Sequence, residues 1–114
     1  MSYRVRFHPA VSDDLRGIAR SMLPHAGKTI TTRVASELRD AARSLQEAPH
    51  RGSLRHEIMP GLRAIPAARR GVIAFTVDDA TREVFVLIIA YGGADWVSRV
   101  PGRRASGREP RSIL

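Results

Sequence analysis

A basic segment, residues 50–70, carries residue types that could bind a phosphate or a carboxylate. Its sequence, HRGSLRHEIMPGLRAIPAARR, contains a single acid, Glu57, among five arginines and two histidines. Guanidinium groups bind carboxylate and phosphate oxygens in a bidentate way. We therefore expect Arg63 on a strand, with Arg69 and Arg70 on the following turn, to contact an acidic partner from one sheet edge. A solvated turn is the alternative for Arg69 and Arg70.

Metal-free RNA cleavage is one chemistry that such a segment could support. It needs a base for the 2′-hydroxyl, cations for the phosphorane charge and an acid for the leaving oxygen. None of the candidates is paired at a diagnostic spacing, and a tyrosine at a strand end commonly shields the core. No firm catalytic residue follows, and the sequence favours a protein that is not an enzyme. The candidates are His56 or Glu57 as the base, Arg63 and Arg70 as clamps, and Tyr91 as a positioned hydroxyl.

Composition narrows the choice of partner. The net charge is +8, and of 19 basic residues only Lys28 is a lysine, so we expect an acidic partner, either nucleic acid or an acidic protein segment. The chain has no cysteine, and its four histidines lack the paired spacing of a zinc helix, so we expect neither a metal nor a cofactor. Without a signal peptide or a membrane-spanning apolar stretch, the expected location is the cytoplasm, with no membrane partner.

One strand and two helices are predicted before residue 48. Residues 3–8 alternate apolar and polar side chains with the period of a strand. Pro9 suits a helix start, Asp13 and Asp14 suit the first turns, and Pro24 is expected to close this first helix. A second helix is expected over residues 29–47. The short link between the two predicts an antiparallel helical hairpin. The apolar stripes are Val11, Leu15, Ile18 and Met22, then Ile30, Val34, Leu38, Ala41 and Leu45.

Three further strands are predicted after a surface loop over residues 49–61. They span residues 62–66, 71–77 and 83–91, and the turn at residues 78–81 makes the last two a hairpin. The last strand is apolar on both faces, so it should lie inside the sheet, with the helices on one side and another layer on the other. The order predicts an α+β fold: an N-terminal strand, an antiparallel helical hairpin and a three-stranded antiparallel meander, which together form one curled sheet.

The composition changes after Trp96. Residues 97–114, VSRVPGRRASGREPRSIL, contain five arginines and one glutamate and can bury little apolar surface. We expect one domain over residues 1–96 and a basic, disordered tail over residues 97–114. A tail that becomes ordered on a polyanion or a partner is the alternative.

Three segments in this order resemble the RelE/ParE superfamily of type II toxin–antitoxin toxins over residues 3–96. They are YRVRFHPAVSDDLRGIA, GLRAIPAARRGVIAFTVDD and VFVLIIAYGGADW, with a long amphipathic helix after the first. The resemblance implies a small toxin that a cognate antitoxin wraps and neutralises, with operator DNA bound only through that antitoxin. One branch of the superfamily cleaves mRNA on the ribosome. The ParE branch instead blocks DNA gyrase without a nuclease site.

The residues favour the ParE branch. Ribonuclease members resemble one another in a basic residue at the entry of the strand that here begins at Val72, and in a His or Arg with a Tyr toward the C-terminal end. Here Arg70 lies two positions before that strand, and the last strand offers Tyr91 without a histidine. The ending YGGADW resembles ParE, although Ala94 stands where relatives often carry a charge. The expected function is gyrase inhibition by protein binding; the alternatives are a ribosome-dependent mRNA endonuclease using Arg63, Arg70 and Tyr91, and a degenerate toxin that only binds its antitoxin.

Two sets of contact residues follow from this resemblance. The antitoxin is expected to bury an amphipathic helix in a groove between helices and sheet, or to add a strand, with its acids meeting arginines. The target-binding set is Arg63, Arg69, Arg70, Tyr91, Asp95 and Trp96. The antitoxin-binding set is Val11, Leu15, Ile18, Arg33 and Arg63.

Overall fold

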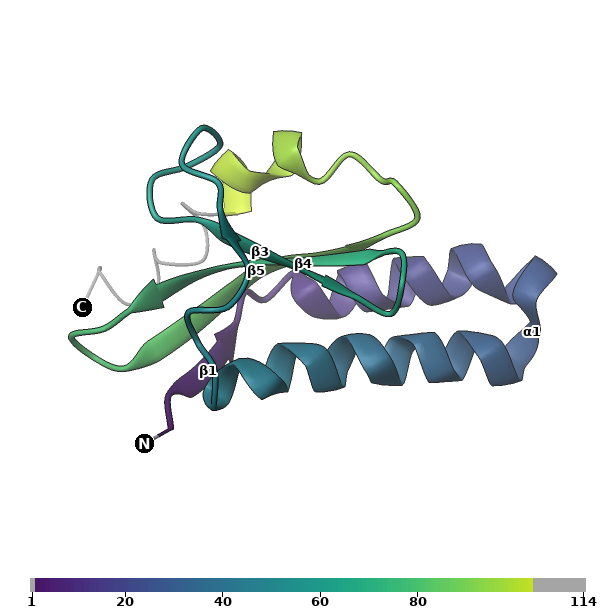
Figure 1. Cartoon of the computed structure of the whole chain (residues 1–114). Helices are drawn as coiled ribbons and strands as arrows, with labels where there is room; N and C mark the ends of the chain where they lie inside the picture. Colours follow the sequence, from purple (N-terminus) through teal and green to yellow (C-terminus); the bar gives the residue numbers. More distant parts are fainter. Residues whose placement is uncertain (1, 104–114) are drawn as a thin grey trace.

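The computed structural model describes residues 2–103, which form one five-stranded sheet with a long helix folded back on itself against one face (Figure 1). This confirms the predicted α+β class. The elements are β1 (Arg4–Phe7), α1 (Val11–Arg43), the 3-10 turn η1 (Ser44–Gln46), β2 (Ser53–Leu54), β3 (Arg63–Ala67), β4 (Gly71–Asp78), β5 (Glu83–Tyr91) and the 3-10 turn η2 (Val97–Arg99). Residues 100–103 continue as helix after η2.

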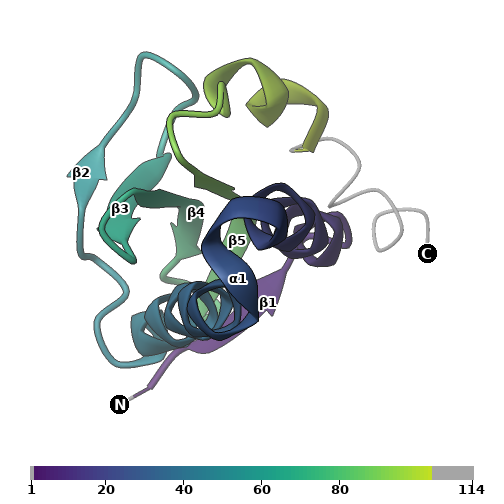
Figure 2. The same ribbon diagram turned by 90° about the vertical axis from the view of Figure 1, so that its right-hand side faces the viewer.

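The helical hairpin is made within α1, which reverses at Gly27. Gly27 has φ 83° and ψ 169°, a conformation that glycine adopts without strain. Figure 2 shows the first limb, residues 11–26, and the second limb, residues 28–43, side by side over the sheet. The prediction that Pro24 ends the first helix was wrong, because the helix continues past it to the reversal. Pro24 is exposed and close to the limb's end, where a proline removes little of the hydrogen-bond ladder.

The sheet has the order β1-β5-β4-β3-β2. β1 runs parallel to β5, whereas β5, β4 and β3 form the predicted antiparallel meander. The edge strand β2 lies in the segment that was predicted to be a loop. It was not predicted because a strand of two residues is too short to show a periodic pattern. It pairs with β3 through Ser53 opposite Ala64 and Leu54 opposite Arg63.

β5 is apolar on both faces because both are covered by core, and a bulge shifts the alternation of its side chains between them. Ala74 of β4 lies opposite Ile88, while the next residue, Phe75, lies opposite Val86, so Leu87 is an extra residue. Val86 therefore joins the core under α1, but Ile88 joins the core on the other face. The strand lies between β1 and β4, which confirms its predicted interior position.

The second face of the sheet is covered by the chain after β5 and by the loop before β3. Met59, Leu62 and Val100 pack there against Leu87 and Ile88. In Figure 1 the turn that ends the described chain lies on the opposite side of the sheet from α1. No helix within residues 2–103 combines the length and the apolar character needed to cross a bilayer.

The C-terminal turn, residues 97–103, corrects the predicted boundary at Trp96. These residues are helical rather than disordered, because Val100 is fully buried and Arg103 forms an ion pair with Asp14. The prediction rested on the average composition of the tail, which does not reveal that one valine is buried and one arginine is paired. The rest of the predicted tail, residues 104–114, lies outside the described residues.

Val100→Ala should lower the free energy of unfolding by about 2 kcal/mol, because it removes two buried methyl groups and leaves a small cavity. Val97→Ala is the matched control: Val97 is 39% exposed, so its truncation should cost less than about 0.5 kcal/mol. Urea unfolding of the full chain measures both values. Equal, small effects would contradict a docked C-terminal turn.

Candidate functional site

A groove lies between the first limb of α1, the end of β5 and the C-terminal turn, and is here called the α1–β5 groove. Its volume is about 780 Å³. Its walls combine apolar side chains, three arginines and two aspartates. The limb contributes Asp13, Asp14, Gly17, Ile18, Ser21, Met22, His25 and Ala26, and the opposite wall contains Arg70, Ile89, Ala90, Tyr91, Gly92, Ala94, Arg99 and Arg103.

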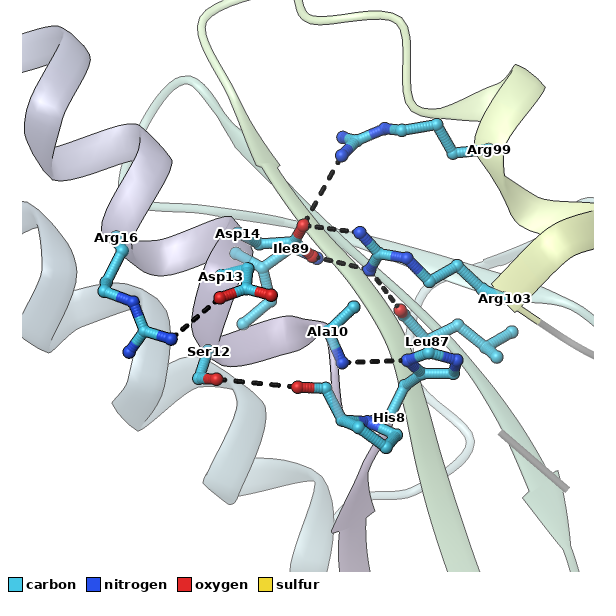
Figure 3. A network of polar contacts seen from close by, with 11 residues as sticks. His8, Ala10, Ser12, Asp13, Asp14, Arg16, Leu87, Ile89, Arg99 and Arg103 are labelled. Carbon is cyan, nitrogen blue, oxygen red and sulfur yellow. Dashed lines mark hydrogen bonds and ion pairs between the residues drawn. The ribbon is translucent and has the colours of Figure 1, made fainter. Parts of the chain in front are cut away.

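Asp14 is the buried charge of this groove, with a side chain only 3% exposed. Its Oδ1 accepts a hydrogen bond from Arg103 at 2.7 Å, and its Oδ2 accepts a second from Arg103 at 2.8 Å. Arg99 adds a longer contact to Oδ1 at 3.4 Å. Figure 3 shows both guanidinium groups reaching this one carboxylate from the C-terminal turn. The hydrogen bonds to Asp14 raise the pKa of Arg103, so Arg103 stays charged.

The same two side chains complete the edge of β5. β1 pairs with β5 only as far as Val86, so within the described residues Leu87–Tyr91 has no strand beside it on that edge. The Ile89 N–H donates to Asp14 Oδ2 at 3.1 Å, and Arg103 donates to the Leu87 carbonyl at 2.9 Å. Buried backbone groups require such partners. Asp14 and Arg103 therefore replace a strand where β1 ends.

His8 joins β1, α1 and the C-terminal turn. It is 6% exposed, and its Nδ1 accepts a hydrogen bond from the Ala10 N–H at the start of α1, at 3.0 Å. An accepting Nδ1 requires the neutral ring with its proton on Nε2. Burial lowers the pKa of His8, and the nearby charge of Arg103 lowers it further. His8 is therefore neutral at neutral pH.

Two of the predicted target-binding residues meet in the groove. Arg70 and Tyr91 both line it, and the Gly92 N–H donates to the Arg70 carbonyl at 3.0 Å, which ties the β3–β4 turn to the end of β5. Arg69 is exposed in the same turn, with a positive φ of 70°. These three residues therefore gather at one end of the sheet.

Arg63 lies elsewhere. Its guanidinium donates to the His50 carbonyl at 2.9 Å and, more weakly, to that of Arg51. Arg63 is opposite Phe75 of β4, whereas Tyr91 is opposite Gly71. The four intervening steps along β4 correspond to roughly 13 Å. The candidate nuclease set of Arg63, Arg70 and Tyr91 does not converge on one point.

Asp95 and Trp96 have structural contacts. Asp95 accepts hydrogen bonds from the N–H and the hydroxyl of Ser98, which lies within η2. Trp96 packs against the second core, and the Arg55 guanidinium lies over its ring at 5.7 Å. Both residues thus hold the C-terminal turn in place.

The two bases suggested by the sequence lie in the loop before β3. Glu57 pairs with Arg55 at 2.6 Å, and this bond lowers the pKa of Glu57. His56 Nδ1 accepts a bond from the Gly61 N–H at 3.2 Å. Neither residue lines the α1–β5 groove. Within residues 2–103, no group of three or more potential metal ligands is clustered.

The predicted antitoxin-binding residues divide between several places. A second hollow of about 340 Å³, here called the Phe7 hollow, contains Val11 and Leu15. Ile18 lines the α1–β5 groove instead, Arg33 lies exposed on the second limb, and Arg63 is on β3. The remaining members of the Phe7 hollow are Phe7, His8, Pro9, Ser12, Arg39, Arg43 and Ile89.

Sequence reasoning missed Asp14, Arg99 and Arg103 as a unit. One signal was present: Asp14 lies on the same helical face as Val11, Leu15 and Ile18, so the period that marks the core also turns Asp14 inward. The partners Arg99 and Arg103 carried no comparable signal, because nothing in a basic tail indicates which arginine docks.

Comparisons with known proteins agree on the fold. The sequence model of the ParE toxin of the type II toxin–antitoxin system parDE matches residues 5–96. The chromosomal ParDE system of P. aeruginosa is similar in structure, with a TM-score of 0.67 and 19% identity over 79% of this chain and 96% of that chain. A mutant of the E. coli toxin RelE in the free state has a TM-score of 0.58 and 20% identity, over 91% of this chain and 98% of that chain. The RelBE2 toxin–antitoxin complex of Mycobacterium tuberculosis has a TM-score of 0.51 and 17% identity, over 81% of this chain and 100% of that chain. The search of curated proteins found no match.

Asp14→Asn should destabilise the fold by about 3 kcal/mol, because it leaves the partly buried Arg103 without its counter-charge. Asp13→Asn is the matched control: Asp13 is 74% exposed and pairs with Arg16, so its effect should stay below about 0.5 kcal/mol. Urea unfolding at neutral pH measures both. Indistinguishable variants would contradict a structural role for the buried pair.

The lowered pKa of His8 predicts a loss of stability in mild acid. Above the ordinary histidine pKa of about 6.5, His8 is neutral in both the folded and unfolded states, and its contribution is complete. Below that value the unfolded chain takes up the proton first, so the free energy of unfolding falls as the pH falls. His8→Asn, which keeps an acceptor for Ala10, should reduce this slope in unfolding curves between about pH 7.5 and pH 5.5. An unchanged slope would contradict this assignment.

Proposed function

Because the chain belongs to the ParE toxin family of type II toxin–antitoxin systems, we propose that it inhibits DNA gyrase by binding it and that a cognate antitoxin neutralises it. The observation that carries the choice of binding over nuclease chemistry is the separation of Arg63 from Arg70 and Tyr91 along the sheet. A phosphoryl-transfer site needs its cations and its acid–base groups around one point.

The buried carboxylate of the α1–β5 groove supports the same choice. Asp14 would be the natural general base there, but its oxygens are occupied by Arg103, Arg99 and the Ile89 N–H. With four hydrogen bonds on its two oxygens, this carboxylate offers no free lone pair to a substrate proton. Asp14 therefore serves the scaffold, and the groove offers a surface rather than a reaction centre.

The target surface proposed here is the cationic end of the α1–β5 groove. Arg70 and Arg99 lie exposed on its wall, while Ile18, Met22 and Tyr91 supply apolar area. An apolar centre flanked by arginines fits the anatomy of protein–protein interfaces and favours a partner with acidic side chains. Gyrase is the partner that the ParE branch implies, and its inhibition places the toxin's action in the cytoplasm.

The antitoxin surface proposed here is the Phe7 hollow. Phe7 is 42% exposed beside Val11 and Leu15, and Arg39 and Arg43 follow one another at helical spacing on the rim. This arrangement fits an amphipathic helix whose acids meet the two arginines. Two of the similar structures are a ParDE toxin–antitoxin system and a RelBE2 toxin–antitoxin complex, which supports an antitoxin partner.

Purified wild-type chain should inhibit supercoiling of relaxed plasmid by gyrase, and two charge reversals should separate its partners. Arg70→Glu should raise the toxin concentration for half-inhibition at least about tenfold, which corresponds to about 1.4 kcal/mol, and should leave antitoxin affinity unchanged. Arg43→Glu should weaken antitoxin binding and leave the toxin concentration for half-inhibition unchanged. Each variant is thus the matched control for the other.

The same preparations distinguish the alternatives. Absence of inhibition at saturating toxin would overturn the gyrase proposal. New codon-linked 5′ ends in primer extension on translated mRNA would then identify a ribosome-dependent endonuclease. Continued growth when the chain is expressed without antitoxin would identify a degenerate toxin.

A further inference from the structure

The helical hairpin extends beyond the sheet that it covers. Its tip, residues 19–30, projects past the ends of the strands in Figure 1 and faces the viewer in Figure 2. None of these described residues is buried; the buried residues of α1 lie at Val11, at Asp14 and from Thr31 onward. Apart from Met22, which packs against the core, packing against the sheet therefore does not account for the tip.

The chemistry of this projection is one-sided. From Leu15 to Ser36 the sequence contains no acid but four cations. Arg16 pairs with Asp13, and the other three are Arg20, Lys28 and Arg33. Leu23 and Ile30 are 49% and 44% exposed at the tip. A scattered exposed apolar residue is ordinary, but two on one projecting turn, surrounded by cations, indicate a contact surface.

The tip is also preformed. The first limb stays helical through Ala26, Gly27 takes the single non-helical conformation, and helix resumes at once. A reversal of one residue leaves little freedom between the limbs. Such a surface loses little conformational entropy when it binds.

We propose that the hairpin tip inserts into an acidic pocket with an apolar floor on the toxin's protein target; this rests on the proposed function and names the target-contacting element. Apolar side chains at the centre and cations at the rim match the core and rim of a protein interface. Met22, His25 and Ala26 of the tip also line the α1–β5 groove, so tip and groove form one continuous surface.

The tip is assigned to the target rather than the antitoxin because of its position on α1. The Phe7 hollow uses Val11, Leu15, Arg39 and Arg43, at the opposite end of both limbs. Single-stranded nucleic acid is a poorer fit, because residues 19–30 contain no Phe, Tyr or Trp on which a base could stack, and His25 is their one aromatic ring.

The test replaces the apolar pair in the full chain, as the double variant Leu23→Gln and Ile30→Gln. Glutamine preserves helix propensity, and both positions are exposed, so the melting temperature should stay close to that of wild type. Leu54→Gln is the matched control, because Leu54 is 47% exposed on β2, away from the tip. Lys28→Glu is a second variant that alters only charge.

The expected result is at least a tenfold rise in the half-inhibitory concentration for gyrase supercoiling with both tip variants, and none with the control. Growth arrest on expression should weaken in parallel, while antitoxin affinity stays unchanged. Tip variants as potent as wild type would overturn the inference, and so would an equal loss of antitoxin affinity. If the wild-type chain arrests growth without inhibiting gyrase, the gyrase proposal fails, but growth arrest by the variants still tests the tip. If the wild-type chain neither arrests growth nor inhibits gyrase, the gyrase proposal and the tip inference both fail.

Discussion

The ion pair between Asp14 and Arg103 is the interaction on which the arrangement of the molecule depends. β1 covers only the first half of β5, so a central strand is left with open backbone groups next to a helix. Asp14 accepts the Ile89 N–H, Arg103 donates to the Leu87 carbonyl, and the two side chains bind each other. One pair thereby closes the sheet edge, anchors the start of α1 and docks the C-terminal turn over the second face.

The bulge at Leu87 explains how a single strand can serve both layers. By adding one residue, it moves Ile88 to the face covered by Val100 and Met59, and it returns Ile89 to the face under α1. It also directs Tyr91 toward the helix side, where it lines the α1–β5 groove beside Arg70. The position of the candidate target surface is thus a consequence of strand register.

Much of the fold could be predicted from two kinds of sequence pattern, the alternation of a strand and the apolar stripe of a helix. Period-two alternation marks β1, and the apolar stripes of both limbs give the hairpin, since each pattern records local geometry. The two errors have different causes. Pro24 is the residue that a sequence pattern marks as the end of a helix, but the chain reverses three residues later, at Gly27. Residues 97–103 look too polar to fold, but Val100 is buried by residues that are distant in the sequence. The site was less predictable than the fold for the same reason: Arg63 and Arg70 are close in sequence, yet strand register separates them, and the docking of Arg103 on Asp14 joins residues far apart in the chain.

In the proposed function, gyrase covers the face formed by the α1–β5 groove and the hairpin tip, while the Phe7 hollow remains free for the antitoxin. Amide hydrogen exchange of the full chain, alone and with the gyrase holoenzyme, distinguishes the two surfaces. We expect slowed exchange in residues 19–30 and around residues 70 and 91–92, with no change around residues 7–15 or 39–43. Protection confined to the Phe7 hollow, or absent throughout, would overturn this assignment of surfaces.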